Sequence, residues 1–107
     1  MKMVHVCENG KVKVVPFTSD LTRLQELVCG FVRPLYGVGK DGLVMLVDED
    51  GNYKDAKPNE KASAIAGQPI VGPVVIVGIN ATKSKFVGFA DNYAKEVANR
   101  IDKGTFR

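Results

Sequence analysis

The chain has 107 residues, of which 45% are hydrophobic and 25% are charged. These values are ordinary for one soluble globular domain, and they exclude a disordered chain, which would carry more charge and fewer apolar residues. The net charge is +3, and the whole surplus lies in residues 55–107, which carry 8 basic and 5 acidic side chains. This excess is too small for a dedicated nucleic-acid-binding protein, although the second half could face an anion.

The first expected elements are two strands and a helix. Valines alternate with other residues on both sides of Asn9-Gly10, and Asn-Gly between two such runs is typical of a β-hairpin. Ser19 or Asp20 can then cap a short helix, with Gly30 expected just after its end at the C′ position. The apolar residues that share one face of this helix are Leu21, Leu24, Leu27 and Val28.

Two more strands are expected in the middle of the chain. Residues 31–36 are interrupted by Pro34, which lacks an amide donor and favours an edge strand or a bend. Residues 43–47 are apolar at every position, which is typical of a strand buried on both faces. After a polar turn, Pro58 could begin a short helix that stops at Gly67.

The last third predicts a central strand and a long helix. Residues 74–77 are all β-branched and are bounded by Pro73 and Gly78. Apolar residues then recur at three- and four-residue spacing over 86–101, which predicts an amphipathic helix that covers the sheet. Gly104–Arg107 is expected to be a frayed tail.

Together these elements predict one α+β domain over residues 1–107. We expect a small, mainly antiparallel sheet of four to five strands, with the first and last helices packed on one face. The other face, or a groove between two chains, would then be left for a partner. A homodimer is one expected arrangement, because an edge strand and part of the last helix would need cover.

No catalytic or metal-binding set is visible, so no catalytic residue, metal or cofactor is predicted. The stretch Gly37–Lys40 departs from a phosphate loop because Asp41 follows the lysine where Ser or Thr is needed. The acidic turn at residues 48–52 has its glycine two positions too early for a calcium loop. His5 is the one histidine and cannot hold a metal alone. We therefore do not expect an enzyme, unless a dimer interface assembles a site from two chains.

The two cysteines are too few for a disulfide framework, and we expect a reduced cytoplasmic chain with both of them in the core. Cys29 faces a helix C-terminus, where the dipole disfavours a thiolate, and Cys7 has no identifiable base. No apolar run approaches the roughly 20 residues that cross a bilayer, so no membrane contact is expected.

The candidate ligand-binding residues are side chains expected at the surface. Tyr53 lies in a polar segment without periodicity, where an aromatic ring has no obvious burial role. Asn59 is a second exposed candidate, although helix capping would also explain it. The cations that could contact a phosphate beside a stacked base are Arg33, Lys54, Lys57 and Lys83. The other aromatic residues that could stack on a base, most of them expected in the core, are Tyr36, Phe86, Phe89 and Tyr93.

Four short motifs follow one another along residues 4–78. They are LQELV closing on Gly30, VDEDG at 47–51, Pro58-Asn59 with Ala62, and Ile70 and Gly72 leading into VVIVG at 74–78. As an ordered set they resemble a family of short uncharacterised proteins from bacteria, their phages and mobile elements, whose domain has no known function. Cys29 departs from the pattern, since the family tends to have a second glycine there. The resemblance implies a phage or mobile-element origin and carries no site residues across.

The resemblance leads us to expect a non-enzymatic binding protein in the cytoplasm of a bacterial host. It would modulate a host pathway, for example a defence system, by binding a host protein. The alternative is an oligomeric module that sequesters a small nucleotide, with Tyr53 stacked on the base and nearby cations on the phosphate. A regulator associated with nucleic acid is a further alternative, which the modest charge disfavours and which predicts affinity that falls steeply with salt.

Overall fold

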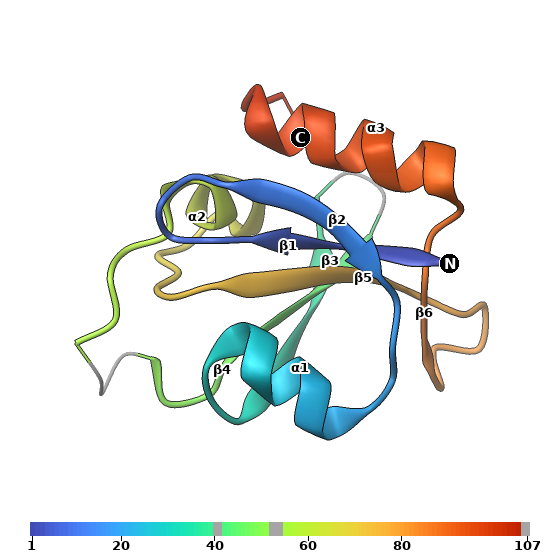
Figure 1. Cartoon of the computed structure of the whole chain (residues 1–107), viewed down its shortest axis with the longest axis horizontal. Coiled ribbons are helices and arrows are strands. Elements are labelled where there is room, and N and C mark those ends of the chain that lie inside the picture. Colours follow the sequence, from blue (N-terminus) through green and yellow to red (C-terminus); the bar gives the residue numbers. More distant parts are fainter. Residues whose placement is uncertain (40–41, 52–54, 106–107) are drawn as a thin grey trace.

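An antiparallel sheet forms the centre of the molecule (Figure 1). The computed structural model describes residues 1–39, 42–51 and 55–105. The strands of the described residues are β1 (Lys2–Val6), β2 (Val12–Pro16), β3 (Val32–Val38), β4 (Leu43–Asp48), β5 (Val74–Ile79) and β6 (Phe86–Val87). Their order is β2-β1-β5-β4-β3, and β6 pairs with β5 beside this path, so the described sheet has six strands and not the four to five that were predicted. The additional strand is β6, whose residues were expected in the last helix. The helices of the same ranges are α1 (Leu21–Val28), α2 (Glu60–Ala66) and α3 (Asp91–Asp102).

The predicted hairpin is confirmed. Strands β1 and β2 pair antiparallel, with Val4 opposite Val14 and Val6 opposite Val12. The turn is closed by the Gly10 amide, which donates to the Cys7 carbonyl at 3.0 Å, and Gly10 has a φ of +91°. Glycine adopts such a positive φ without a steric penalty, which explains why an Asn-Gly pair stands at this turn.

The strand predictions for the middle of the sheet are also confirmed. Strand β5 lies between β1 and β4, and residues 74–78 are all buried. Every residue of β4 is buried as well, which agrees with its apolar sequence. Strand β3, which contains Pro34, lies at the edge of the sheet, where a missing amide donor costs least.

The helices cover both faces of the sheet, so the prediction of two helices on one face is wrong. Figure 1 shows α1 on one side of the sheet, with α2 and α3 on the other. On one face of the sheet, α1 packs through Leu24, Leu27 and Val28. The sheet residues of this cluster are Val44, Leu46, Val75 and Val77. The side chains of α2 and α3 that pack with the other face are Ala62, Ile65, Ala94, Val97 and Ile101. Strands that are apolar on both faces require cover on both, because each fully buried Leu or Val side chain contributes about 1.5–3 kcal/mol.

The end of α1 differs from its prediction by one residue. Asp20 caps the start, its carboxylate accepting from the Thr22 amide at 3.1 Å. The left-handed residue at the end is Cys29, with a φ of 62°, and not Gly30. Gly30 is needed for another reason, since a Cβ there would collide with the carboxylate of Asp48. A glycine would adopt the left-handed backbone at position 29 without a steric penalty.

The C-terminal helix is shorter than its pattern predicts. The apolar spacing begins at Phe86, but residues 86–87 form β6, and α3 starts only at Asp91. Phe89 belongs to the sheet side, because its backbone pairs with Lys2 in an isolated bridge. Backbone pairing with the sheet therefore overrides helical periodicity over 86–90. No helix within the described ranges is long and apolar enough to cross a membrane.

Candidate functional site

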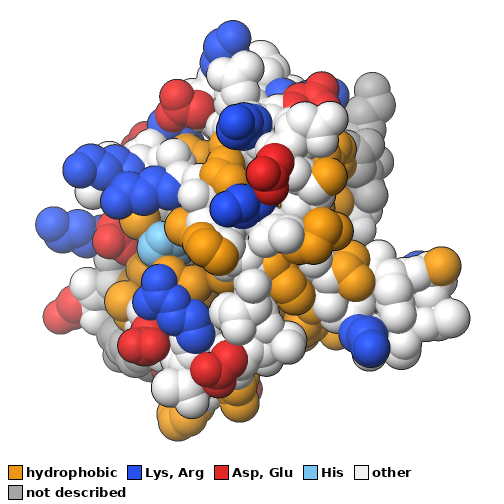
Figure 2. Space-filling view, turned by 45° about the vertical axis from the view of Figure 1, so that its right-hand side comes forward, with side chains coloured by type: hydrophobic (Ala, Val, Ile, Leu, Met, Phe, Trp, Pro, Cys, Tyr) orange, Lys and Arg blue, Asp and Glu red, His pale blue; other side chains and the backbone are white. Residues whose placement is uncertain are grey.

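An open pocket of about 530 Å³ lies where β3, β5 and β6 approach one another. We call it the aromatic–basic pocket, and its lining residues are Phe17, Ser19, Tyr36, Ile79, Lys83, Ser84, Lys85 and Phe86. Figure 2 turns the β6 side of the molecule forward and shows hydrophobic side chains at the surface beside Lys and Arg side chains. The pocket volume is in the range of small-molecule sites in proteins, roughly 300–1,000 Å³.

Aromatic rings form the apolar part of this pocket. Tyr36 stands on the edge strand β3 and is 61% exposed, which is unusual for so large an apolar side chain. Phe86 is half-buried in β6, opposite Ile79 of β5. The ring centroids of Tyr36 and Phe86 lie 6.5 Å apart, and their planes are tilted by 35°. One ring is therefore held by the sheet while the other stands free beside it.

The basic part of the pocket is a loop that Asn80 organises. The Asn80 carboxamide oxygen accepts from the Ser84 amide at 2.8 Å and from the Lys85 amide at 3.2 Å. Its backbone carbonyl accepts from the Lys83 amide at 2.9 Å. Lys83 has a φ of 58°, a left-handed conformation that is uncommon for a residue other than glycine. These bonds hold Lys83 and Lys85 in place at the mouth of the pocket.

The charge of the aromatic–basic pocket distinguishes it from the other pockets. Among the described residues, its lining contains two lysines and no carboxylate. A pocket between α2 and α3 has Glu60 and Asp102, a pocket beside the β1–β2 turn has Glu8 and Glu60, and a small one near β3 has Asp48. An anion in any of these three would meet a like charge, whereas the charged groups described in the aromatic–basic pocket are cations.

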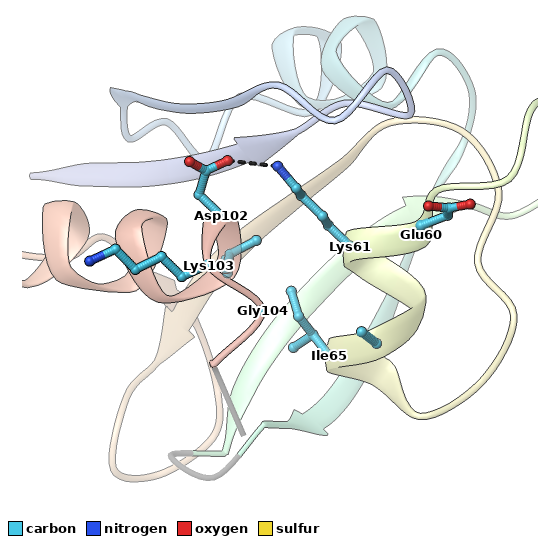
Figure 3. A pocket seen from close by; sticks show the side chains of 8 residues that line it. Glu60, Lys61, Ile65, Asp102, Lys103 and Gly104 are labelled. Carbon is cyan, nitrogen blue, oxygen red and sulfur yellow. Dashed lines mark hydrogen bonds and ion pairs between the residues drawn. The ribbon is translucent and has the colours of Figure 1, made fainter.

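The pocket between α2 and α3 holds about 260 Å³ and has an apolar floor that includes Ile65 and Ile101 (Figure 3). Lys61 and Asp102 point toward each other between the two helices, with Nζ and Oδ1 2.6 Å apart. The Lys61 ammonium also donates to the Gly10 carbonyl at 2.7 Å. This lysine is therefore committed to contacts within the fold and offers little charge to a ligand.

The predicted site residues that the structure describes are spread over three pockets, and of them Lys57 and Asn59 share one. Lys83 lines the aromatic–basic pocket, while Arg33 lines the small pocket near Asp48. Lys57 and Asn59 line the pocket beside the β1–β2 turn. The remaining candidates, Tyr53 and Lys54, lie outside the described residues, as do Lys40 and Asp41 of the glycine-rich stretch.

Asn59 is buried, so the prediction of an exposed residue is wrong. Its carboxamide donates to the Val6 carbonyl at 3.0 Å and to the Gly72 carbonyl at 2.9 Å. The oxygen of the same group accepts from the Ala62 amide at 3.1 Å and caps α2, as the alternative explanation held. Both of its N–H donors are thus used inside the fold, which makes Asn59 a structural residue that joins β1, α2 and the segment before β5.

The sequence analysis missed a base beside Cys7. The thiol of Cys7, directly after the end of β1, lies 3.8 Å from Nδ1 of His5, two residues earlier in the chain. Nε2 of His5 lies 2.9 Å from the Leu27 carbonyl, which can only accept, so Nδ1 is the nitrogen that accepts from the thiol. Residues i and i+2 share one face of a strand, which was the signal for this pair.

This thiol is not activated. Burial raises the pKa of Cys7, and the neighbouring Glu8 carboxylate raises it further. The neutral thiol is therefore favoured, which is the opposite of what a nucleophilic cysteine needs. Neither cysteine is buried in the core as predicted, since Cys7 is half-buried and Cys29 is exposed. Within the described residues no three His, Cys, Asp or Glu side chains lie close enough to hold a metal ion.

Four aromatic or basic residues of the aromatic–basic pocket were not among the predicted site residues. Tyr36 and Phe86 were named only among the aromatic residues that could stack on a base, most of which were expected in the core, and Phe17 and Lys85 were not considered. Phe89 does lie in the core, with its ring 5.2 Å from that of Tyr93 in an edge-to-face arrangement. The available signal was the polar run at 80–85, with lysines two residues apart, directly before an aromatic residue.

Comparison with known proteins gives one match. The model of a domain of unknown function, DUF3846, matches residues 1–102, which is nearly the whole chain. No curated protein and no solved structure matches the chain. The match agrees with the expectation of a domain of unknown function, and it assigns no activity and no site residue.

Proposed function

The chain belongs to the DUF3846 family, and on that premise we propose that it is a non-enzymatic binding protein whose partner contacts the aromatic–basic pocket. The observation that carries this proposal is the convergence of aromatic rings and two lysines on one pocket without a carboxylate. Such a lining favours a partner that combines a negative charge with a flat or apolar group. The partner is therefore expected to be anionic.

The hydroxyl groups of this pocket also favour binding over catalysis. Ser84 is engaged with the Thr82 hydroxyl at 2.7 Å and with the Asn80 carboxamide at 3.1 Å. The lining, within the residues that the structure describes, has no histidine, cysteine or carboxylate that could take a proton from Ser19 or Ser84. The hydroxyls can donate or accept hydrogen bonds to a ligand, and this supports a binding role.

Both partner classes expected from the sequence are compatible with an anionic partner. A host protein could present an acidic segment with an aromatic residue, and a nucleotide would present a base and a phosphate. An origin in a phage or mobile element, action on a host defence pathway, a cytoplasmic location and a homodimer stay predictions. The edge strand β3 supports the dimer hypothesis, because its outer side has no strand partner in the sheet.

Native mass spectrometry of protein purified from cells tests the proposal. The wild type is compared with a pocket variant, Tyr36→Leu/Lys83→Asn/Lys85→Gln, and with a control, Phe31→Leu/Lys95→Gln. The control residues are exposed and lie outside the pocket. We expect a partner that is retained by the wild type and the control and is lost from the pocket variant. Retention of the same partner by all three proteins, or by none, would contradict the proposal.

A further inference from the structure

We propose that the aromatic–basic pocket takes a nucleoside phosphate, with the base inserted between Tyr36 and Phe86 and the phosphate held by Lys83 and Lys85. This inference rests on the proposed function and names the chemical class of its partner. Its evidence is the spacing of the two rings, the placement of the two lysines and the volume between them.

The rings of Tyr36 and Phe86 admit a base only when Tyr36 turns. Stacked bases lie roughly 3.4 Å apart along a nucleic-acid strand, so a base between two rings needs them about 7 Å apart and parallel. The two rings form a tilted aromatic pair in contact range, with centroids 6.5 Å apart and planes at 35°. Insertion therefore requires a rotation that opens the pair. Tyr36 is the ring that can turn, because it is 61% exposed while Phe86 is held in β6.

The two lysines of the pocket lining are the cations available to a phosphate attached to that base. Lys83 and Lys85 line the same pocket as the rings and flank Ser84 in the loop that Asn80 organises. In the part of the chain that the structure describes, neither lysine forms an ion pair. Lysine binds phosphate as a point charge, and two of them on an ordered loop lower the cost of ordering upon binding.

The left-handed backbone at Lys83 is a second sign that this position is used. A residue with a side chain is disfavoured in this left-handed conformation, whereas glycine adopts it without a steric penalty. The residue there is a lysine instead, and its backbone amide donates a hydrogen bond to the Asn80 carbonyl. Strain of this kind is often found at ligand-binding positions. The volume of about 530 Å³ also leaves room for a mononucleotide.

Titration of the full chain with defined probes tests this inference. Backbone amide resonances are followed while one of four probes is added: a set of nucleoside monophosphates, the uncharged nucleosides, inorganic phosphate, or a short single-stranded oligonucleotide. We expect at least one monophosphate to bind and to shift the amides of residues 80–86 and of Tyr36. The matching nucleoside and inorganic phosphate should each bind roughly tenfold more weakly, since each lacks one of the two contacts.

Variants separate the two contacts. Tyr36→Leu should lower affinity for the monophosphate roughly tenfold, whereas Tyr36→Phe keeps the ring and should bind like the wild type. Phe31→Leu changes another exposed aromatic residue at the other end of the β3 region and should have no effect. Lys83→Asn keeps a residue that tolerates a left-handed backbone but removes the charge, so affinity should fall and depend less on salt.

Three results would overturn the inference. The first is that no monophosphate binds. The second is that the base makes no contribution to binding. This would be seen if Tyr36→Leu bound as tightly as the wild type, or if inorganic phosphate bound as tightly as the nucleotide. The third is that only the oligonucleotide binds, which assigns the surface to single-stranded nucleic acid. The proposed function would survive all three if the pocket variant still lost a co-purified protein partner.

Discussion

The aromatic–basic pocket and the pocket between α2 and α3 have similar openings at the surface and differ in how their charges are used. Between the helices, Lys61 contacts Asp102 and the Gly10 carbonyl, so its charge is neutralised within the fold. In the aromatic–basic pocket, Lys83 and Lys85 line a wall without carboxylates. The floor between the helices is also part of the main core, through Ile65 and Ile101. The balance of charge in the lining therefore distinguishes the proposed ligand site from the contact between α2 and α3.

The largest expected effect is a loss of stability when Asn59, the residue that caps α2, is replaced. Asn59→Ala would leave the Val6 and Gly72 carbonyls without their donor and remove the cap of α2. We expect the free energy of unfolding to fall by about 3 kcal/mol, measured by urea denaturation, because unsatisfied buried groups and a lost cap add up. Ligand binding by the surviving folded protein should not change.

Asn59→Asp is the matched control, because it keeps the capping oxygen and loses both donors. It should lose most of the same stability if the two carbonyl contacts matter more than the cap. If folded Asn59→Ala protein lost ligand binding completely, the start of α2 would take part in the ligand site. The contrast drawn between the two pockets would then be wrong.

The second test uses the two left-handed residues that are not glycine. Cys29 and Lys83 have nearly equal φ values, 62° and 58°. Replacing either by glycine should raise the free energy of unfolding by up to about 1 kcal/mol, because the left-handed penalty outweighs the added chain entropy. Cys29→Gly should leave ligand binding unchanged, whereas Lys83→Gly should weaken it.

Cys29→Ala and Lys83→Ala serve as controls that keep the strain and change only the side chain. Equal binding by Lys83→Gly and the wild type would remove Lys83 from the site. A fall in stability in both glycine variants would show that the φ values cost nothing at these positions.

The third test asks whether the thiol of Cys7, which lines neither pocket, is reactive. Since burial and Glu8 raise the pKa of the Cys7 thiol, little thiolate is present near neutral pH. We expect iodoacetamide to label exposed Cys29 before Cys7, and labelling of Cys7 to increase only at alkaline pH, as read by mass spectrometry. Rapid labelling of Cys7 near neutral pH would identify an activated thiol with His5 as its base and would break the comparison.

The smallest expected effect belongs to the ion pair between α2 and α3. The side chains of Lys61 and Asp102 are 30% and 60% exposed, so solvent screens the pair. Asp102→Asn should change the free energy of unfolding by about 0.5 kcal/mol or less, and added salt should reduce the difference. Asp91→Asn, at the other end of α3, is an exposed control of the same type. A clearly larger effect would mean that this seam depends on charge more than its packing indicates.

Much of the fold could be predicted from local sequence. The hairpin at Asn9-Gly10, a helix cap at Ser19 or Asp20 and a central strand over 74–77 were predicted from turn geometry, capping and β-branched residues. The structure has the hairpin, the cap at Asp20 and a strand that continues to Ile79. The start of α3 could not be predicted in this way, because Phe86 and Val87 pair with β5 and Phe89 pairs with Lys2 although their spacing is helical. Local periodicity contains no information on these pairings with other strands.

The candidate site was less accessible to sequence reasoning than the fold. Lys83 was named for its charge, but its neighbours Phe17, Tyr36 and Phe86 come from three separate segments. Arg33, Lys57 and Asn59 were grouped with Lys83 by residue type, and the structure distributes them over other places. Residue type predicts which side chains could bind an anion but not which of them meet.

The sequence by itself determined the elements of this protein: an α+β chain with two strands that are apolar on both faces and little net charge. Only the tertiary structure decided that helices cover both faces, that Asn59 is buried, and that exposed Tyr36 stands beside Phe86 and the lysines of the 80–85 loop. The physical reason is that propensity, capping and turn geometry act over a few residues. The pairing of β5 with β1, β4 and β6 brings together segments far apart in the chain, and it is this pairing that builds the pocket.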